Sequence, residues 1–174
     1  MDVVVANAGA VESVPFSKMV PEQLTANLAV NLVGVVNVWQ AALSGMKASG
    51  WGRLIAVAST AGLKGYPYVT VYCAAKHGVV GLTRALALEL GDSGVTANAI
   101  CPGFIETPLL HRSIDTIMQK TGMSKEATRA SLTKANPQNR FIQTGEVAGT
   151  VLWLCSDQAR SVNGQALSLS GGEI

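Results

Sequence analysis

The chain has few charged residues, few aromatic residues and few cysteines for its length. Of its 174 residues, 14% are charged and 5% are aromatic, and the formal net charge is only +2. Because there is no basic cluster, nothing in the sequence indicates binding to nucleic acid or to an anionic membrane. No apolar run reaches the length that we expect of a membrane span, and residues 1–10 lack the basic flank of a signal peptide. These absences predict a globular, cytoplasmic protein.

The cysteines give no sign of a metal site or of disulfide bonds. Cys73, Cys101 and Cys155 are odd in number and far apart, and they form neither a Cys-x-x-Cys pair nor a zinc-type spacing. We therefore expect free thiols and no bound metal. Because 48% of the residues are hydrophobic, residues 1–174 are expected to form a single domain with one core.

Short apolar runs alternate with longer apolar stretches along the chain. The short runs predict strands at residues 2–6, 53–58, about 95–100 and about 166–170. The longer stretches predict helices at about 21–46, 69–90 and 144–155, the last with Thr144 as its N-cap, and two short helices near 108–120 and 124–135. This alternation predicts an α/β fold, with a mainly parallel, doubly wound sheet that is covered by helices on both faces.

Polar and glycine-containing turns follow the predicted strands. Asn7, Ser59 and Pro102-Gly103 come just after three different strands. In an open parallel sheet, binding sites form in the crevice at the carboxyl ends of the strands. We therefore expect these residues to lie around one site.

Tyr72 and Lys76 are four residues apart on a predicted helix, so they project from one face of it. A free tyrosine has a pKa near ~10 and is a poor base at neutral pH. A neighbouring ammonium favours the phenolate, and we expect Lys76 to lower the pKa of Tyr72 towards neutrality. Ser59 could hydrogen-bond the same substrate oxygen, and Asn31 could bend the preceding helix or hold a water molecule that links Lys76 to solvent.

Taken together, these motifs resemble the short-chain dehydrogenase/reductase family over essentially the whole chain. The matching residues are Asn7-Ala8-Gly9, Asn31, Ser59 with Gly62, Tyr72 with Lys76, Asn98, and Pro102-Gly103 with Thr107. The resemblance implies that Tyr72 is the general acid/base, that Ser59 orients the carbonyl, and that Lys76 and Asn31 complete a proton relay. Asn98 would be structural.

The resemblance also implies that the protein uses NAD or NADP as its cofactor. Asn7, Ala8 and Gly9 would line the adenosine side, while Tyr72 and Lys76 would bind near the nicotinamide ribose. Pro102, Gly103, Ile105 and Thr107 would hold the nicotinamide end, and residues 104–140 would form a lid over a small ketone or alcohol substrate. The lid length is more like that of polyketide ketoreductases and hydroxybutyrate dehydrogenases than that of the shortest reductases.

The chain departs from the family in one respect. Family members begin with a strand, a Gly-x-x-x-Gly-x-Gly turn and a helix that together bind the pyrophosphate, and this sequence has no such turn. It resembles the C-terminal two-thirds of a member, so we expect a partial Rossmann fold of about four strands without the N-terminal βαβ units. Residues 2–6 would then be an unprotected edge strand.

Two functions follow from these observations. The first is an NAD(P)-dependent oxidoreductase that interconverts a secondary alcohol and a ketone by hydride transfer. The second is a non-catalytic remnant that acts as an oligomerisation or interaction module, because the phosphate-binding turn is missing. A hydrolase using Ser59 is disfavoured, since Ser59 lies in no Gly-x-Ser-x-Gly elbow. The helices at 21–48 and 69–90 are apolar on more than one side, which predicts a homo-oligomer.

Overall fold

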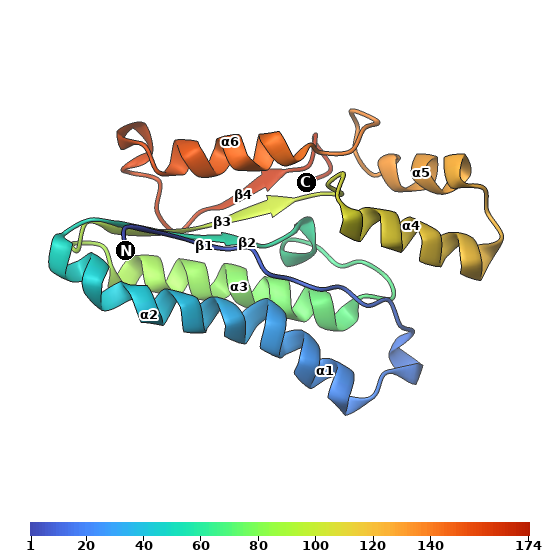
Figure 1. Cartoon of the computed structure of the whole chain (residues 1–174), viewed down its shortest axis with the longest axis horizontal. Coiled ribbons are helices and arrows are strands. Elements are labelled where there is room, and N and C mark those ends of the chain that lie inside the picture. The colour runs from blue at the N-terminus through green and yellow to red at the C-terminus, as the bar shows by residue number, and fades with distance from the viewer.

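Four parallel strands form one sheet in the computed structural model, which describes residues 1–174 (Figure 1). The strands are β1 (Val3–Ala6), β2 (Gly52–Val57), β3 (Val95–Pro102) and β4 (Ala166–Leu169). They lie in the order β1-β2-β3-β4, so each strand pairs with its neighbour in sequence. The predicted four-stranded parallel sheet is therefore confirmed.

Helices cover both faces of the sheet, as the doubly wound prediction required (Figure 1). Helices α2 and α3 lie on one face, and α6 lies on the other. The α-helices are α1 (Pro21–Leu28), α2 (Gly34–Ser49), α3 (Thr70–Glu89), α4 (Pro108–Thr121), α5 (Lys125–Thr133) and α6 (Thr144–Leu154). The pair α4 and α5 extends beyond the carboxyl ends of the strands.

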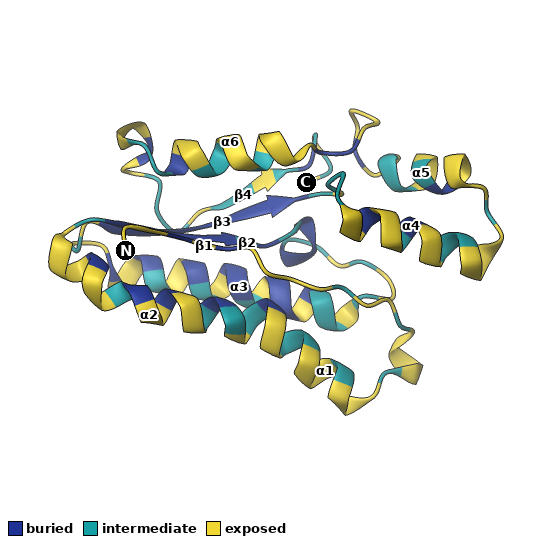
Figure 2. Cartoon of the chain, in the orientation of Figure 1, coloured by how far each residue is buried: buried dark blue, intermediate teal, exposed yellow.

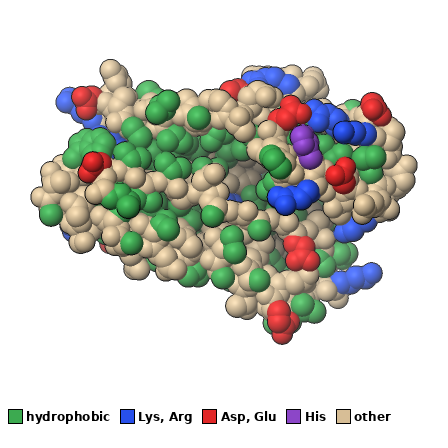
Figure 3. Space-filling model, viewed as in Figure 1, with side chains coloured by type: hydrophobic (Ala, Val, Ile, Leu, Met, Phe, Trp, Pro, Cys, Tyr) green, Lys and Arg blue, Asp and Glu red, His purple; other side chains and the backbone are tan.

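The two faces of the sheet are buried to different extents (Figure 2). The cluster between the sheet and the α2–α3 layer contains 16 buried hydrophobic residues, whereas the cluster beneath α6 contains four. On the edge strand β1, Val3 and Val5 remain 36% and 40% exposed. Figure 3 shows a band of hydrophobic side chains between α6 and the α2–α3 layer. The predicted unprotected edge strand is therefore confirmed.

The helix predicted at about 21–46 forms, but it contradicts the expectation that no apolar run reaches the length of a membrane span. Helices α1 and α2 are joined by a π-helical turn, Ala29–Val33, into a helix that runs from Pro21 to Ser49. With 29 residues and a mean hydropathy of 1.4, it is long and apolar enough to cross a membrane. In this fold the helix instead covers one face of the sheet, because Trp39 and Met46 are buried in the cluster that packs on the sheet.

Two element boundaries also differ from the prediction. Strand β3 continues to Pro102 because β4 pairs with its last residues, Cys101 with Ser168 and Pro102 with Leu169. The N-cap of α6 is Gln143 and not Thr144, which is the first helical residue.

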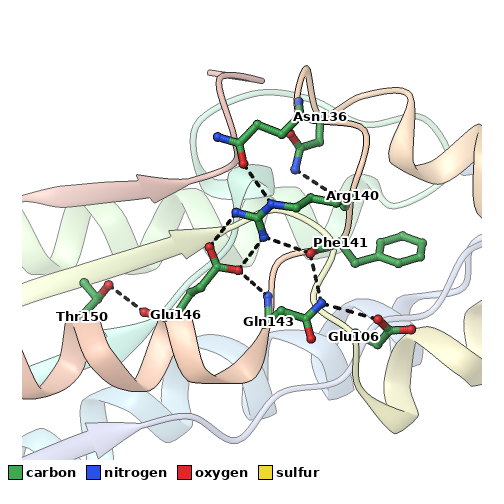
Figure 4. A network of polar contacts seen from close by, with 8 residues as sticks. Glu106, Asn136, Arg140, Phe141, Gln143, Glu146 and Thr150 are labelled. Carbon is green, nitrogen blue, oxygen red and sulfur yellow. Dashed lines mark hydrogen bonds and ion pairs between the residues drawn. The ribbon is translucent and has the colours of Figure 1, made fainter.

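A polar network ties the start of the segment after β3 to α6 (Figure 4). Arg140 donates two hydrogen bonds to Glu146, at 2.7 and 2.8 Å, and Glu146 accepts a third from the backbone of Gln143 at 2.7 Å. These contacts lower the pKa of Glu146 to about 2. On the other side of the network, Glu106 pairs with Arg129 at 2.7 Å and lies 3.5 Å from the Gln143 amide nitrogen. The predicted lid is thus anchored at its base.

Candidate active site

Ser59, Tyr72 and Lys76 come together where β2 ends and α3 begins. Ser59 follows β2, and its hydroxyl accepts a hydrogen bond from the backbone of Ala61 at 3.1 Å. The Lys76 side chain is enclosed, since the residue is only 4% exposed, and its amine donates to the Val57 carbonyl at 2.9 Å. The amine lies 5.5 Å from the centre of the Tyr72 ring. The three side chains predicted to work together therefore share one environment.

The predicted effect of Lys76 on Tyr72 is wrong for this structure. Burial raises the pKa of the Tyr72 phenol above its usual value of 10.0, and the nearby Ser59 side chain only partly opposes this rise. Lys76 is not among the groups that shift the pKa of the phenol. Its amine donates to the Val57 carbonyl. The phenol is therefore held in its protonated, donating form.

Burial acts on Lys76 in the opposite sense. Removing the ammonium from water lowers the pKa of Lys76 to about 8, and a smaller contribution from the neighbouring Cys101 raises it. No carboxylate contributes to this shift. A charged amine is thus kept in an enclosed site without a compensating acid, which is costly for folding and typical of functional sites.

Gly62 lets the turn after Ser59 pack closely against α3. A Cβ atom at Gly62 would lie 2.8 Å from the carbonyl oxygen of Lys76, which is closer than side-chain carbons are found. The glycine that the sequence placed in the motif therefore brings Ser59 near the Tyr72 and Lys76 face of the helix.

Asn31 joins the long helix to the loop that follows β1. Its side chain is fully buried in the π-helical turn, so the helix is locally irregular at this residue, as predicted. The amide donates to the Ala10 carbonyl at 2.8 Å and accepts from the Ala10 backbone at 3.3 Å. It also contacts Asn27 at 3.1 Å. Asn31 therefore fixes the loop that carries Asn7, Ala8 and Gly9.

The turn after β3 lies at the same edge of the sheet. The Gly103 backbone donates to the Leu169 carbonyl at 3.0 Å, and Ile105 bridges to Ile142. The Thr107 hydroxyl caps α4 by accepting from the Leu110 backbone at 3.4 Å. Pro102 ends β3 and is buried. The predicted residues of this turn are thus held in place by β4 and by the start of the lid.

Asn98 has the structural role that the sequence analysis assigned to it. Its buried side chain donates to the Val162 carbonyl at 2.8 Å and accepts from the Gln165 backbone at 3.0 Å. These bonds hold the segment before β4 against β3.

Comparisons with known proteins find relatives that match almost the whole chain. The family model described as enoyl-(acyl carrier protein) reductase matches residues 1–173. A D-beta-hydroxybutyrate dehydrogenase from Cupriavidus necator is 40% identical over 174 residues, with 99% of this chain and 67% of that protein covered. A granaticin polyketide synthase ketoacyl reductase from Streptomyces violaceoruber is 39% identical, with 99% and 64% covered. The chain thus spans about two-thirds of the length of these relatives.

The chain belongs to the short-chain dehydrogenase/reductase family. Among solved structures, a variant of actinorhodin polyketide ketoreductase crystallised with NADPH is 37% identical, with a TM-score of 0.94. The match covers 99% of this chain and 67% of that protein. A levodione reductase is 33% identical, with a TM-score of 0.92, and 99% and 66% are covered. These relatives are named dehydrogenases and reductases, so the family identified from the motifs is confirmed as one of oxidoreductases.

Residues near Lys76 fit the nicotinamide and ribose half of the dinucleotide that the family uses. One N–H of the Lys76 amine reaches the Val57 carbonyl, which leaves two further donors. A Cβ atom at Gly9 would lie 3.7 Å from that amine and 3.1 Å from the Asn31 side-chain oxygen, so a side chain there would crowd the approach to the amine. For the pyrophosphate half, the sequence contains no glycine-rich turn of the family type.

A polar cluster beside Ser59 was not predicted from the sequence. Tyr66 contacts both Thr60 and Glu173, and Lys64 pairs with Glu173 at 2.7 Å. One signal was present in the sequence, because Glu173 is the only charged residue after Arg160. The contact itself joins residues 107 positions apart, which spacing alone does not reveal.

Proposed function

We propose that this protein is an NAD(P)-dependent oxidoreductase that interconverts a secondary alcohol and a ketone. The observation that carries the proposal is the shared environment of Ser59, Tyr72 and Lys76 at the carboxyl edge of the sheet. Solved relatives crystallised with NADPH or with NADP bound support this choice of cofactor. Because hydroxybutyrate dehydrogenases and ketoacyl reductases are among the relatives, small β-keto or β-hydroxy acyl compounds are the substrates to try first.

The state of Tyr72 favours the reductive direction. Bound NAD(P)H would supply the hydride. Tyr72, whose pKa is raised by burial, keeps its proton at neutral pH and would donate it to the oxygen of the ketone. Ser59 would donate a hydrogen bond to the same oxygen and fix its position. Lys76, with a pKa of about 8, would hold positive charge beside the ring and restore the phenolic proton.

The other predicted residues would build the walls of this site. Asn31 would fix the loop of Asn7, Ala8 and Gly9 on the adenosine side, through its bonds to Ala10. Pro102, Gly103, Ile105 and Thr107 would hold the nicotinamide end, and residues 104–140 would close over the substrate.

Turnover and binding test this proposal together. The purified chain is incubated with NADH or NADPH and a panel of β-keto esters and cyclic ketones, and dinucleotide binding is measured by calorimetry. Turnover should fall at least about a hundredfold in Tyr72→Phe, the scale of a lost general acid. If the chain bound no dinucleotide and gave no turnover, the oxidoreductase assignment would fail for these 174 residues.

A non-catalytic interaction module is the second candidate. It is favoured by the edge strand β1, whose Val3 and Val5 leave apolar surface open. A stable complex that forms equally well with Tyr72→Phe, in the absence of any turnover, would support this candidate.

We also propose that the protein self-associates through its long helices and works in the cytoplasm. Val30, Val33 and Val38 of the Pro21–Ser49 helix and Leu88 of α3 are exposed large apolar side chains. Covering such side chains is what a subunit interface does. Sedimentation should show an oligomer that Val38→Glu weakens, and a monomer at all concentrations would contradict this proposal.

A further inference from the structure

The C-terminal tail, residues 170–174, folds back beside the candidate site. Gly171 and Gly172 have φ values of +64° and +98°, which glycine adopts without strain. The Ser170 hydroxyl accepts from the Ile174 backbone at 3.3 Å, and Ser170 itself is buried. A Cβ atom at Gly171 would collide with the Asn136 side chain, so the tail packs tightly there. This geometry aims the Glu173 side chain inward.

The Glu173 carboxylate is the charged centre of a buried polar cluster. Its side chain is only 4% exposed, and one carboxylate oxygen receives both the Tyr66 hydroxyl, at 2.5 Å, and the Lys64 amine, at 2.7 Å. Burying a carboxylate is costly unless donors surround it, so these two partners define where Glu173 can sit. Burial and the contact with Glu173 both raise the pKa of Tyr66, which stays protonated.

A chain of hydroxyl groups leads from this carboxylate to the residue next to Ser59. The Tyr66 oxygen lies 2.7 Å from the Thr60 hydroxyl oxygen as well as 2.5 Å from Glu173. A phenol has one proton and a carboxylate only accepts, so Tyr66 donates to Glu173 and the Thr60 hydroxyl donates to Tyr66. Thr60 is buried and begins the short turn that Ser59 caps. The position of Ser59 is therefore linked to Glu173.

Glu173 also faces the turn after β3. A Cβ atom at Gly103 would lie 3.4 Å from the second carboxylate oxygen of Glu173, and neither Tyr66 nor Lys64 contacts that oxygen. The carboxylate thus lies between the turn that begins at Ser59 and the turn that begins at Pro102.

We infer that Glu173 is a positioning residue, which acts through Tyr66 and Thr60 to fix the turn that carries Ser59 beside Tyr72. The inference deepens the proposed function and rests on it. A tail that merely filled space would not need a buried carboxylate, and no other charged residue follows Arg160. Loosening the cluster should leave the fold intact and change the surroundings of the Tyr72 phenol.

Tyrosine NMR tests this inference without dinucleotide or substrate. The chain has three tyrosines, so labelling with [13Cζ]tyrosine gives three signals, which single Tyr→Phe variants assign. The Tyr72 signal should shift by more than its line width in Glu173→Gln and in Thr60→Val, while the Tyr68 signal stays in place. Glu146→Gln is the matched control, because the Glu146 carboxylate on α6 pairs with Arg140 outside this cluster, and it should leave the Tyr72 signal unchanged.

The outcomes separate this inference from the proposed function. An unchanged Tyr72 signal in both folded variants would overturn the inference, and so would an equal shift in Glu146→Gln. If Glu173→Gln fails to fold, Thr60→Val decides alone, since valine keeps the shape of threonine without its hydroxyl. If the parent chain turns over substrate, kcat should fall about tenfold in Glu173→Gln and Thr60→Val, which is the scale of one lost hydrogen bond. The dinucleotide affinity of both variants should be unchanged. If the Tyr72 signal shifts but the chain shows no turnover, the proposed oxidoreductase function is refuted. The link from Glu173 through Tyr66 and Thr60 to the site is then still supported.

Discussion

Replacing Lys76 by methionine should stabilise the folded chain at neutral pH. Burial lowers the pKa of this lysine from 10.5 to about 8. Since one pH unit corresponds to about 1.4 kcal/mol, keeping the buried amine charged costs the folded state roughly 3 kcal/mol. The hydrogen bond to the Val57 carbonyl stabilises the folded state by about 1 kcal/mol and offsets part of this cost. Lys76→Met should therefore raise the free energy of unfolding by about 2 kcal/mol at pH 7.

The effect of Lys76→Met on the free energy of unfolding depends on pH. Below about pH 8 the amine is charged in both the folded and the unfolded chain, so the full cost remains. Between about 8 and 10.5 the folded chain loses this proton first, so the contribution of Lys76 to stability improves as the pH rises. The advantage of Lys76→Met should thus shrink across that window and vanish before its upper end.

Urea unfolding, followed by tryptophan fluorescence at pH 7, 9 and 10.5, measures the difference between the two proteins. Subtracting one curve from the other removes the titration of groups common to both. A variant that is less stable than the parent at pH 7, by the same amount at every pH, would show that Lys76 serves the fold. Our reasoning about a functional lysine would then be refuted.

Two further substitutions test packing and charge in the same way. Gly62→Ala should destabilise the fold by about 1–3 kcal/mol, because its Cβ would lie 2.8 Å from the Lys76 carbonyl oxygen. Gly65→Ala is the matched control, since nothing lies within 4 Å of a Cβ there, and equal effects on the urea midpoint would contradict the packing argument. Glu146→Gln should lose stability at pH 7 but not near pH 2, because the pair with Arg140 lowers the pKa of Glu146 to about 2 and stabilises the fold only above that value. A loss that was independent of pH would count against this account.

The fold could be predicted from the sequence because its signals are local. Apolar runs such as residues 53–58 lie between polar turns, and all four strands and the lid helices formed close to the predicted residues. The ends that differed depend on partners. Strand β3 reaches Pro102 because β4 lies beside it, and α6 is capped by Gln143 through contacts with Glu146.

The site could be predicted only in part. The spacing of Tyr72 and Lys76 placed their side chains in one environment, as expected from a helix. The direction of the Tyr72 pKa shift could not be predicted, because it depends on how deeply the phenol is buried and on where the Lys76 amine points. Glu173 was missed for a similar reason, since its contact with Tyr66 forms only after the tail folds back.

Transfer of a labelled hydride tests the central claim most directly. The chain is incubated with NADH or NADPH deuterated at the transferable position of the nicotinamide and with a β-keto ester, and the alcohol product is analysed by mass spectrometry. We expect one deuterium at the carbinol carbon with the parent chain and none above background with Tyr72→Phe. Unlabelled product, or equal labelling in the two proteins, would contradict a reaction that depends on the phenol of Tyr72.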